Sequence, residues 1–336
     1  MAKRLQNGTI ILRERPSIIA SAAVGGKKEG EGPLGKYFDY ICDDGYFAQK
    51  TWEQAESEFQ KDAFRRAVAK GSFTESDINY IFSGDLLNQC TASAFAHRAS
   101  STAYVGLYSA CATFAEGLAG SALFINAGYA DIAAACVSSH FATAERQYRY
   151  PMEYGGQRAP AAQWTVTGAG CAIIGKSAAG GPAITSVTLG SIVDAGICDA
   201  NNMGAAMAPA AYDTISKVLR DTETTPRDYD LIVTGDLGTV GRDIVRDLFR
   251  MEQGIVMGDN YIDCGAEIFS VDTQDVHAGG SGAGCSASVF CGFLMNQIHV
   301  GRWKKVLFAG TGALLSPLSV QQGESIPAIC HAVCIG

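Results

Sequence analysis

Two long segments of the chain carry the same order of hydrophobic and polar features. Residues 109–139 and 282–316 each read as a turn of small residues, an apolar helix, a glycine stop and an uninterrupted apolar strand. A helix that is apolar on all sides must be covered on all sides. Apolar strands such as DIAAACVSS and KKVLFAG are typical of sheets that are buried on both faces. The pattern therefore predicts helices buried between two sheets.

A second pair of segments strengthens the internal repeat. Residues 74–89 and 225–240 each predict a short acidic linker, a strand and a turn, which falls at Gly84-Asp85 in one and at Gly235-Asp236 in the other. Each copy follows an amphipathic helix. Such self-similarity indicates a duplicated architecture.

The duplication predicts an α/β fold with five layers, α/β/α/β/α. We expect an N-terminal half over residues 1–180 and a C-terminal half over residues 181–336. Aligning Gly128 with Gly301 places Cys111 opposite Gly284, at the contact between the halves. The apolar tail ESIPAICHAVCIG (324–336) is expected to lie beyond the core and to need a partner.

Composition and charge narrow the function classes. The 336 residues are 47% hydrophobic and 18% charged, and the net charge of -8 argues against nucleic-acid binding. The uncharged stretch 276–301 contains many glycines and polar residues, so it predicts a buried helix after a glycine-rich turn, and not a membrane span. The P-loop pattern at residues 170–177 lies in an apolar strand and is set aside, because a phosphate loop must open a helix.

Eleven cysteines lie mostly in apolar runs, which is typical of reduced, buried thiols. Cys330, His331 and Cys334 lack a second ligand pair, so we predict no metal site, and the sequence indicates no cofactor. Cys111 is different because it opens a helix, where the helix dipole and free amides stabilise a thiolate. From its position alone, Cys111 is either a nucleophile or a small structural residue.

The chain resembles the thiolase and ketoacyl synthase superfamily and, within it, the stage V sporulation AD family. The resemblance covers roughly residues 15–320 and rests on the duplicated pattern together with several stretches: EYGGQRAPAAQWTVTGAGCAIIG, DANNMGAAMAPAAYDTI, DLIVTGDLGTVGRDI, QDVHAGGSGAGCSA and GTGALLSPLSVQQGESIPAI. In the resembled enzymes, the cysteine at the position of Cys111 attacks an acyl thioester. The glycine turn matched by Gly310-Thr311-Gly312 offers an oxyanion amide.

The catalytic set implied by the resemblance is incomplete in this chain. His277 matches one base position of the enzymes, but no histidine follows the strand YDLIVTG, where the enzymes carry another. Losing one member of a cooperative set removes most of the rate. We therefore expect a binding pocket in which Cys111 and His277 are vestigial. The alternative is an active acyltransferase with Cys111 as nucleophile and His277 as base.

The resemblance implies dipicolinic acid (pyridine-2,6-dicarboxylate), free or as its calcium chelate, as the ligand. Arginine forks suit carboxylates, and aromatic slots suit a flat ring. The expected ligand-binding residues are Cys111, His277, Arg149, Arg158, Trp164, Asn202, Met203, Met207 and Gly312. The loop 198–211 would cover the pocket mouth, and Arg149 and Arg158 have an equal alternative as part of a dimer-interface loop.

The resemblance also implies a place and partners for the protein. We expect a homodimer in the forespore or spore, associated with the inner membrane through other membrane-embedded stage V sporulation proteins. A further alternative is an assembly platform whose pocket is vestigial.

Overall fold

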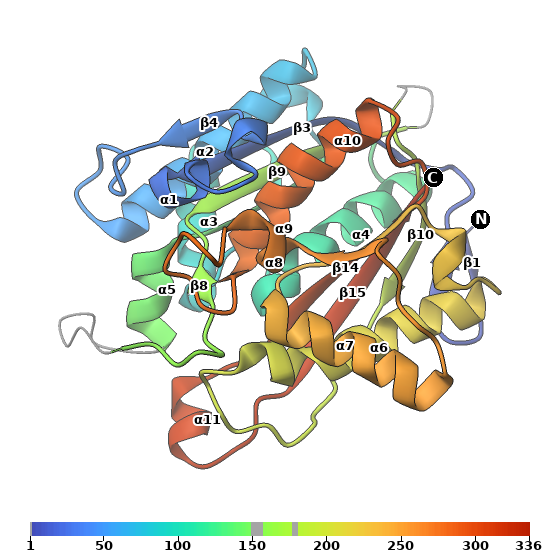
Figure 1. Ribbon diagram of the computed structural model, residues 1–336. Coiled ribbons are helices and arrows are strands. Elements are labelled where there is room, and N and C mark those ends of the chain that lie inside the picture. The colour runs from blue at the N-terminus through green and yellow to red at the C-terminus, as the bar shows by residue number, and fades with distance from the viewer. Residues whose placement is uncertain (1, 149–156, 177–180) are drawn as a thin grey trace.

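A computed structural model gives the structure of the chain and describes residues 2–148, 157–176 and 181–336 (Figure 1). Two large sheets dominate the described residues. The first runs in the order β4 (Tyr40–Cys42), β3 (Ser17–Gly26), β9 (Gly168–Gly175), β7 (Ile132–Ser139), β5 (Tyr80–Gly84), β6 (Ala103–Leu107). The second runs β1 (Lys3–Arg4), β2 (Thr9–Ile11), β10 (Ile184–Leu189), β15 (Ala328–Ile335), β14 (Val306–Ala313), β11 (Leu231–Thr234), β12 (Tyr261–Asp263).

The two sheets repeat one topology. The strands β3-β9-β7-β5-β6 of the first sheet correspond in order to β10-β15-β14-β11-β12 of the second. The directions match as well, because the first two pairings in each series are antiparallel and the last two are parallel. The structure therefore confirms the predicted duplication.

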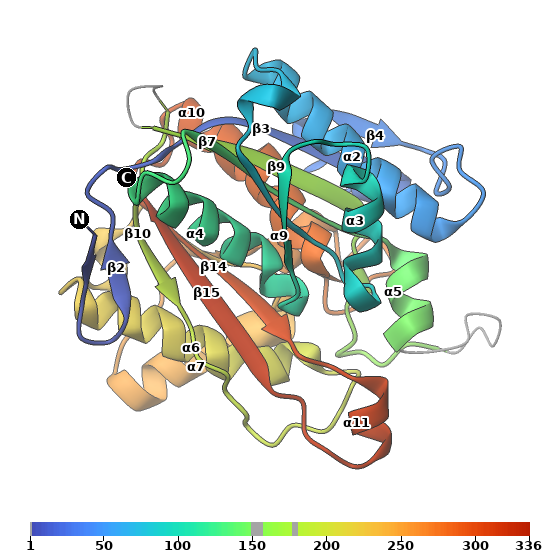
Figure 2. The same ribbon diagram turned by 180° about the vertical axis from the view of Figure 1, so that it is seen from behind.

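The helices form three layers around these sheets. Between the sheets lie α4 (Thr113–Asn126) and α9 (Ala283–Val289), the latter continuing through a π-helical turn into α10 (Met295–His299) (Figures 1 and 2). The outer face of the first sheet carries α2 (Trp52–Lys70) and α3 (Thr91–His97), and the outer face of the second carries α6 (Met203–Asp221) and α7 (Gly238–Gln253). The predicted five-layer α/β/α/β/α fold is confirmed.

The remaining α-helices and strands of the described residues are short. They are α1 (Lys27–Gly30), α5 (Phe141–Tyr148), α8 (Cys264–Ile268), α11 (Pro317–Gln321), and a two-stranded ribbon of β8 (Trp164–Thr165) and β13 (Gly280–Ser281). The uncharged stretch 276–301 contains the buried helix α9, as predicted, and the partly buried α10. No helix in the described ranges is both long enough and apolar enough to cross a membrane.

The repeat extends to individual hydrogen bonds. Thr74 and Asp77 form a capping box before β5, and Thr225 and Asp228 form the same box before β11. Each box satisfies backbone donors of a short 3-10 turn and so fixes the entry of the chain into its strand. The two halves thus reach their strands by the same local chemistry.

Two sequence expectations for the C-terminal half are wrong. The tail 324–336 contains β15, which pairs with β10 on one side and β14 on the other, so it belongs to the core. Gly310-Thr311-Gly312 lies within strand β14 and forms no turn. A Cβ on Gly310 would lie 2.6 Å from the Ala115 side chain, and a Cβ on Gly312 would lie 2.5 Å from the Ser109 carbonyl oxygen. These glycines therefore permit close contact between β14 and the start of α4.

Buried carboxyl groups should make stability depend on pH. Burial raises the pKa of Glu29 to about 7 and that of Glu56 to about 8. A raised folded-state pKa gives stability that is fully present below the unfolded-state value of 4.5 and is lost as pH rises to the folded-state value. We expect the melting temperature to fall between about pH 4.5 and about pH 8. Thermal unfolding of Glu56→Gln should show a weaker pH dependence than the wild type, and an unchanged dependence would contradict this assignment.

Candidate functional site

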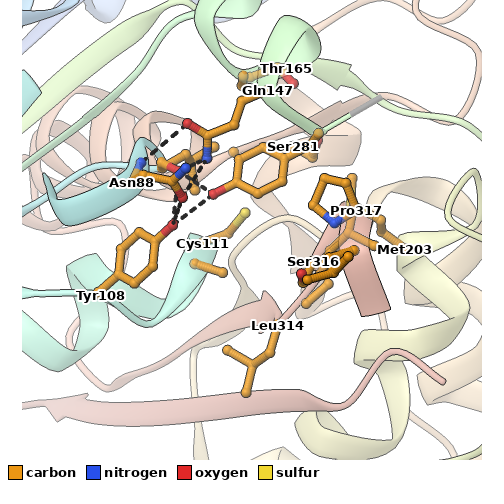
Figure 3. Close-up of a pocket in the computed structure, with 18 residues that line it drawn as sticks. Asn88, Tyr108, Cys111, Gln147, Thr165, Met203, Ser281, Leu314, Ser316 and Pro317 are labelled. Atoms are coloured by element: carbon orange, nitrogen blue, oxygen red, sulfur yellow. Dashed lines mark hydrogen bonds between the residues drawn. The ribbon is translucent and has the colours of Figure 1, made fainter. Parts of the chain in front are cut away.

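The main pocket opens where the two halves meet. Its volume is about 570 Å³, and its walls come from the ends of β5, β14 and the β8–β13 ribbon and from α5, α6 and α11. Figure 3 shows Asn88, Tyr108 and Gln147 on one side and Met203 and Pro317 on the other. The lining residues are Leu86, Asn88, Tyr108, Ala110, Cys111, Ala144, Gln147, Tyr148, Thr165, Met203, Ser281, Gly282, Ala313, Leu314, Leu315, Ser316, Pro317 and Leu318.

Cys111 lies at the floor of this pocket, as its position at the start of a buried helix predicts. It stands in the 3-10 turn Ala110–Ala112, directly before α4, and is 7% exposed. The preceding Ala110 has a φ of 49°, a left-handed conformation that costs energy for any residue other than glycine. This backbone turn directs residue 111 to the seam between the halves, where Figure 3 shows its sulfur between the two walls.

A buried carboxyl stands next to this thiol, in the segment after β11 that lacks the histidine of the resembled enzymes. Asp236 follows β11, is fully buried, and accepts hydrogen bonds from the Thr311 hydroxyl (2.8 Å) and the Gly282 amide (3.1 Å). The Cys111 side chain is its third hydrogen-bond partner. Burial raises the pKa of Asp236 to about 6, although these three hydrogen bonds favour its ionised form.

The turn that carries Asp236 is fixed by a second buried acid. Asp263, at the end of β12, accepts hydrogen bonds from the amides of Leu237 (2.9 Å) and Gly238 (2.8 Å) and from the Thr234 hydroxyl (2.7 Å). Gly238 has a φ of 64°, and a Cβ there would lie 2.3 Å from the Ala278 carbonyl oxygen, so only glycine suits this turn. Asp263 is therefore a positioning residue for Asp236.

One wall of the pocket is a polar network around the carbonyl oxygen of Leu86. Tyr148 donates its hydroxyl to this oxygen, and the Gln147 amide donates to it over 3.2 Å. The Tyr108 and Tyr148 hydroxyl oxygens are 2.9 Å apart. The backbone N–H of Asn88 donates to the side-chain oxygen of Gln147 over 3.2 Å. These groups are neutral donors and acceptors, which suits polar atoms of a ligand.

Two buried acids support this wall from behind. Asp85 accepts hydrogen bonds from the amides of Leu87 (2.8 Å) and Ser93 (2.7 Å), which fixes the segment after β5. Glu56 accepts a hydrogen bond from the Thr143 hydroxyl on α5 (2.6 Å). Burial is the main cause that raises the pKa of both carboxyls.

The opposite wall corrects the expected loop over residues 198–211. Helix α6 already begins at Met203, so most of this segment is helical. Asn202 is the N-cap of α6, its side-chain oxygen accepting from the Ala205 amide at 3.2 Å, and Met207 is fully buried in the core beside α7. Of these three predicted site residues, only Met203 lines the pocket.

Three other predicted site residues gather away from the pocket. Arg158 donates to the Asp275 carboxylate (3.0 Å), His277 lies 3.2 Å from that carboxylate, and Arg158 also covers the Trp164 ring at 4.4 Å. Thr165 lines the pocket, and consecutive strand residues point to opposite faces, so Trp164 points to the other face of the ribbon. Gly312 lies in β14 beside the lining residue Ala313, and Arg149 is outside the described residues.

Comparison with known proteins identifies the family. The family model described as stage V sporulation protein AD matches residues 6–336. The stage V sporulation protein AD of Bacillus subtilis (strain 168) is 44% identical over 321 residues, which cover 95% of this chain and 94% of that protein. The chain belongs to the stage V sporulation protein AD family. The match extends beyond the expected range of residues 15–320 at both ends, in agreement with the central place of β15.

Solved structures show that this member of the AD family has a thiolase-like fold. The 3-oxoacyl-[acyl-carrier-protein] synthase III of Aquifex aeolicus VF5 superposes with a TM-score of 0.58 at 12% identity, over 95% of this chain and 99% of that chain. A variant of OleA from Xanthomonas campestris gives 0.61 at 14% identity, over 97% of this chain and 99% of that chain. At such identities, the likeness concerns the fold alone.

Sequence reasoning missed much of this AD-family pocket. It did not assign Asp236, although the Gly-Asp pair recurs in both halves and so carried a signal. Asn88, Tyr108 and Gln147 have no local motif, because their polar network forms only when β5, β6 and α5 come together. The wall 313–318 follows β14 and becomes recognisable only once that strand is placed.

The burial of the eleven cysteines predicts their order of reactivity. Cys198 is exposed, Cys111 reaches the pocket, and the other nine are buried away from it. Iodoacetamide should label Cys198 first and Cys111 more slowly, and should leave the rest intact until the protein unfolds. Peptide mass mapping checks this order, with Cys198→Ser as the control. Early labelling of Cys136 in native protein would contradict the packing described here.

Proposed function

We propose that this protein binds dipicolinic acid in the Cys111 pocket and supports its uptake into the developing spore. The observation that carries the proposal is the combination of membership in the sporulation AD family with a roomy thiolase-type pocket whose thiol faces a carboxyl. The ligand is a flat ring with two coplanar carboxylates, so it requires apolar walls and hydrogen-bond donors at its edges.

The described lining supplies both kinds of contact. Leu86, Met203, Leu314 and Pro317 offer apolar surface for the ring faces. The hydroxyls of the pocket tyrosines, serines and threonine and the side-chain amides of Asn88 and Gln147 offer hydrogen-bond donors to carboxylate oxygens. The list of donors is Tyr108, Tyr148, Thr165, Ser281, Ser316, Asn88 and Gln147.

The charge of these groups favours the calcium chelate as the bound form. The polar groups just named are neutral, and the Asp236 carboxyl lies directly behind Cys111 and Gly282. Burying an ion among neutral groups costs more than burying a neutral molecule. A one-to-one chelate of a divalent cation with a dianion is neutral overall, so it enters this pocket at a lower desolvation cost than the free dianion.

Isothermal titration calorimetry tests this proposal. We expect saturable binding of the pyridine-2,6-dicarboxylate chelate and no binding of the pyridine-3,4 isomer. Tyr108→Phe should weaken binding about tenfold to 100-fold, because a hydrogen bond to a charged group contributes about 1.5–3 kcal/mol. Tyr129→Phe is the matched control, since Tyr129 is 71% exposed and lies outside the pocket. Absence of binding by both isomers would refute the proposal.

We further propose that the protein has lost catalysis. In a thiol–histidine pair, a neutral imidazole accepts the thiol proton and the resulting cation stabilises the thiolate. Here the partner is a carboxyl whose pKa is about 6, below the value of about 8.5 for a free thiol, so transfer of a proton to it is unfavourable. An ionised carboxylate also opposes a neighbouring thiolate by like-charge repulsion.

An acylation assay separates this proposal from the acyltransferase alternative. After incubation with acyl-CoA or an acyl-carrier protein, intact-mass spectrometry should show the unmodified protein. The acyltransferase alternative requires an adduct that is present in the wild type and absent from Cys111→Ala. Such an adduct would establish that Cys111 still acts as a nucleophile.

We also propose that the protein is a homodimer of the forespore that reaches the inner membrane through membrane-embedded stage V sporulation proteins. Strand β6 supports the dimer, because it is the last strand at one edge of its sheet and is largely exposed. Unpaired edge strands readily pair with another chain. Phe95 on the adjacent α3 is 53% exposed and adds apolar surface beside this edge.

Light scattering after size exclusion tests the dimer. The wild type should have the mass of two chains. Phe95→Glu should shift it towards one chain, because a charge would be buried in the interface. Val256→Glu is the control, since Val256 is 78% exposed and lies between α7 and β12, which belongs to the other sheet from β6. A monomeric wild type would refute the dimer.

A further inference from the structure

Asp236 is a buried acid one layer behind the pocket floor. Its two immediate neighbours Cys111 and Gly282 line the cavity, while Asp236 itself is fully buried. The Thr311 hydroxyl holds one carboxylate oxygen, and the Gly282 amide holds the other. The carboxyl is thus fixed in place and is close enough to the cavity for its charge to act on a bound ligand.

The described groups around Asp236 do not neutralise it. Thiols face it from four elements: Cys111 before α4, Cys264 on α8, Cys285 on α9 and Cys330 on β15. The remaining ionisable neighbour is the Asp263 carboxyl at the end of β12, which is itself buried. These described neighbours carry either no charge or a negative one. Burial raises the pKa of Asp236 to about 6, so at neutral pH it is mostly ionised and easily protonated.

An anionic ligand in the pocket would repel this carboxylate. Like charges interact strongly when water is excluded between them. The repulsion is relieved when Asp236 takes up a proton, and the uncharged carboxyl can still hydrogen-bond to Cys111 and Thr311. We propose that free dipicolinate enters the Cys111 pocket together with one proton, which binds Asp236 from solvent and leaves with the ligand.

The neutral calcium chelate requires no such proton. Calcium neutralises the charge of the ligand, and a proton neutralises the charge of Asp236, so each removes the repulsion between the two. This inference rests on the proposed function, because it concerns the dipicolinate that the pocket is proposed to bind. It adds that the affinity for the free ligand, in contrast to that for the chelate, is controlled by pH through Asp236.

Calorimetry in buffers of different ionisation enthalpy measures the proton directly. Free pyridine-2,6-dicarboxylate is titrated into the full chain in calcium-free phosphate and Tris at about pH 7.5, where Asp236 is ionised in the unbound protein. We expect uptake of about one proton per ligand and an affinity that falls about tenfold per pH unit above about pH 6. The chelate, titrated in HEPES and Tris, should bind with no proton uptake.

Two isosteric variants assign the proton to Asp236. Asp236→Asn should abolish proton uptake and flatten the pH dependence. Asp275→Asn should retain both, because Asp275 is exposed and interacts with Arg158 and His277 away from the pocket. If Asp236→Asn does not fold, infrared difference spectra of the wild type provide the second readout, since ligand binding should produce the carbonyl band of a protonated carboxyl.

The outcomes separate this inference from the proposed function. Binding of free dipicolinate without proton uptake in the wild type, or uptake that persists in Asp236→Asn, overturns the inference and leaves the binding function standing. Absence of binding by the free ligand and by the chelate overturns both.

Discussion

Close contact between the buried helices and the sheets is the constraint on which the site depends. A Cβ on Gly310 or Gly312 of β14 would collide with the start of α4, and a Cβ on Gly284 would lie 2.3 Å from the Gly168 carbonyl oxygen of β9. At these points, backbone meets backbone or a small side chain, with no room for anything larger. This proximity brings the Cys111 turn from one half against Asp236 and Thr311 from the other. Larger residues at the glycines would separate the thiol from the carboxyl.

Duplication gives the two halves equivalent acids with different tasks. Asp85 and Asp236 follow the equivalent strands β5 and β11, each directly after a glycine. Asp85 holds the amides of Leu87 and Ser93, so it fixes the segment that forms the polar wall. The amide of Leu237, next to Asp236, donates instead to Asp263. The Asp236 oxygens accept hydrogen bonds from Gly282 and Thr311 at the seam between the halves. One pocket serves both halves, so only one of the two acids lies beside the thiol.

The sequence predicts the layers well because they rest on periodic features. The apolar helices, the paired Gly-Asp turns and the buried strands recur, and each copy supports the interpretation of the other. The predictions from sequence fail where the position of a segment depends on contacts with residues that are distant in the chain. The tail AICHAVCI is a short apolar run that could lie anywhere, and only its pairing with β10 and β14 makes it central. A glycine that permits close approach of two segments cannot be told in the sequence from a glycine that makes a turn. For this reason the sequence suggested a turn at residues 310–312, which lie in a strand.

The candidate site was less predictable than the fold for a related reason. Trp164 and Thr165 are adjacent, yet the alternation of a strand assigns one to the pocket and the other to the opposite face. On that face, Arg158 packs over the Trp164 ring. Asp275 interacts with both Arg158 and His277 there. Charge complementarity with a dicarboxylate favoured Arg158 as a ligand residue, and the resemblance favoured His277, but neither argument indicates on which face of the β8–β13 ribbon these residues lie.

The carboxyl at position 236 offers a physical basis for the proposed loss of catalysis and gain of ligand binding. An imidazole at this place would serve the thiol, because it removes the thiol proton and then stabilises the anion that is left. A carboxylate can accept the thiol proton, but the acid that it becomes is neutral and lacks the positive charge that would stabilise the thiolate. In the role proposed for Asp236, the carboxyl at this buried position instead responds to the charge of the molecule in the pocket. Under that proposal, catalysis and charge balance are alternative uses of one site, and the side chain at 236 selects between them.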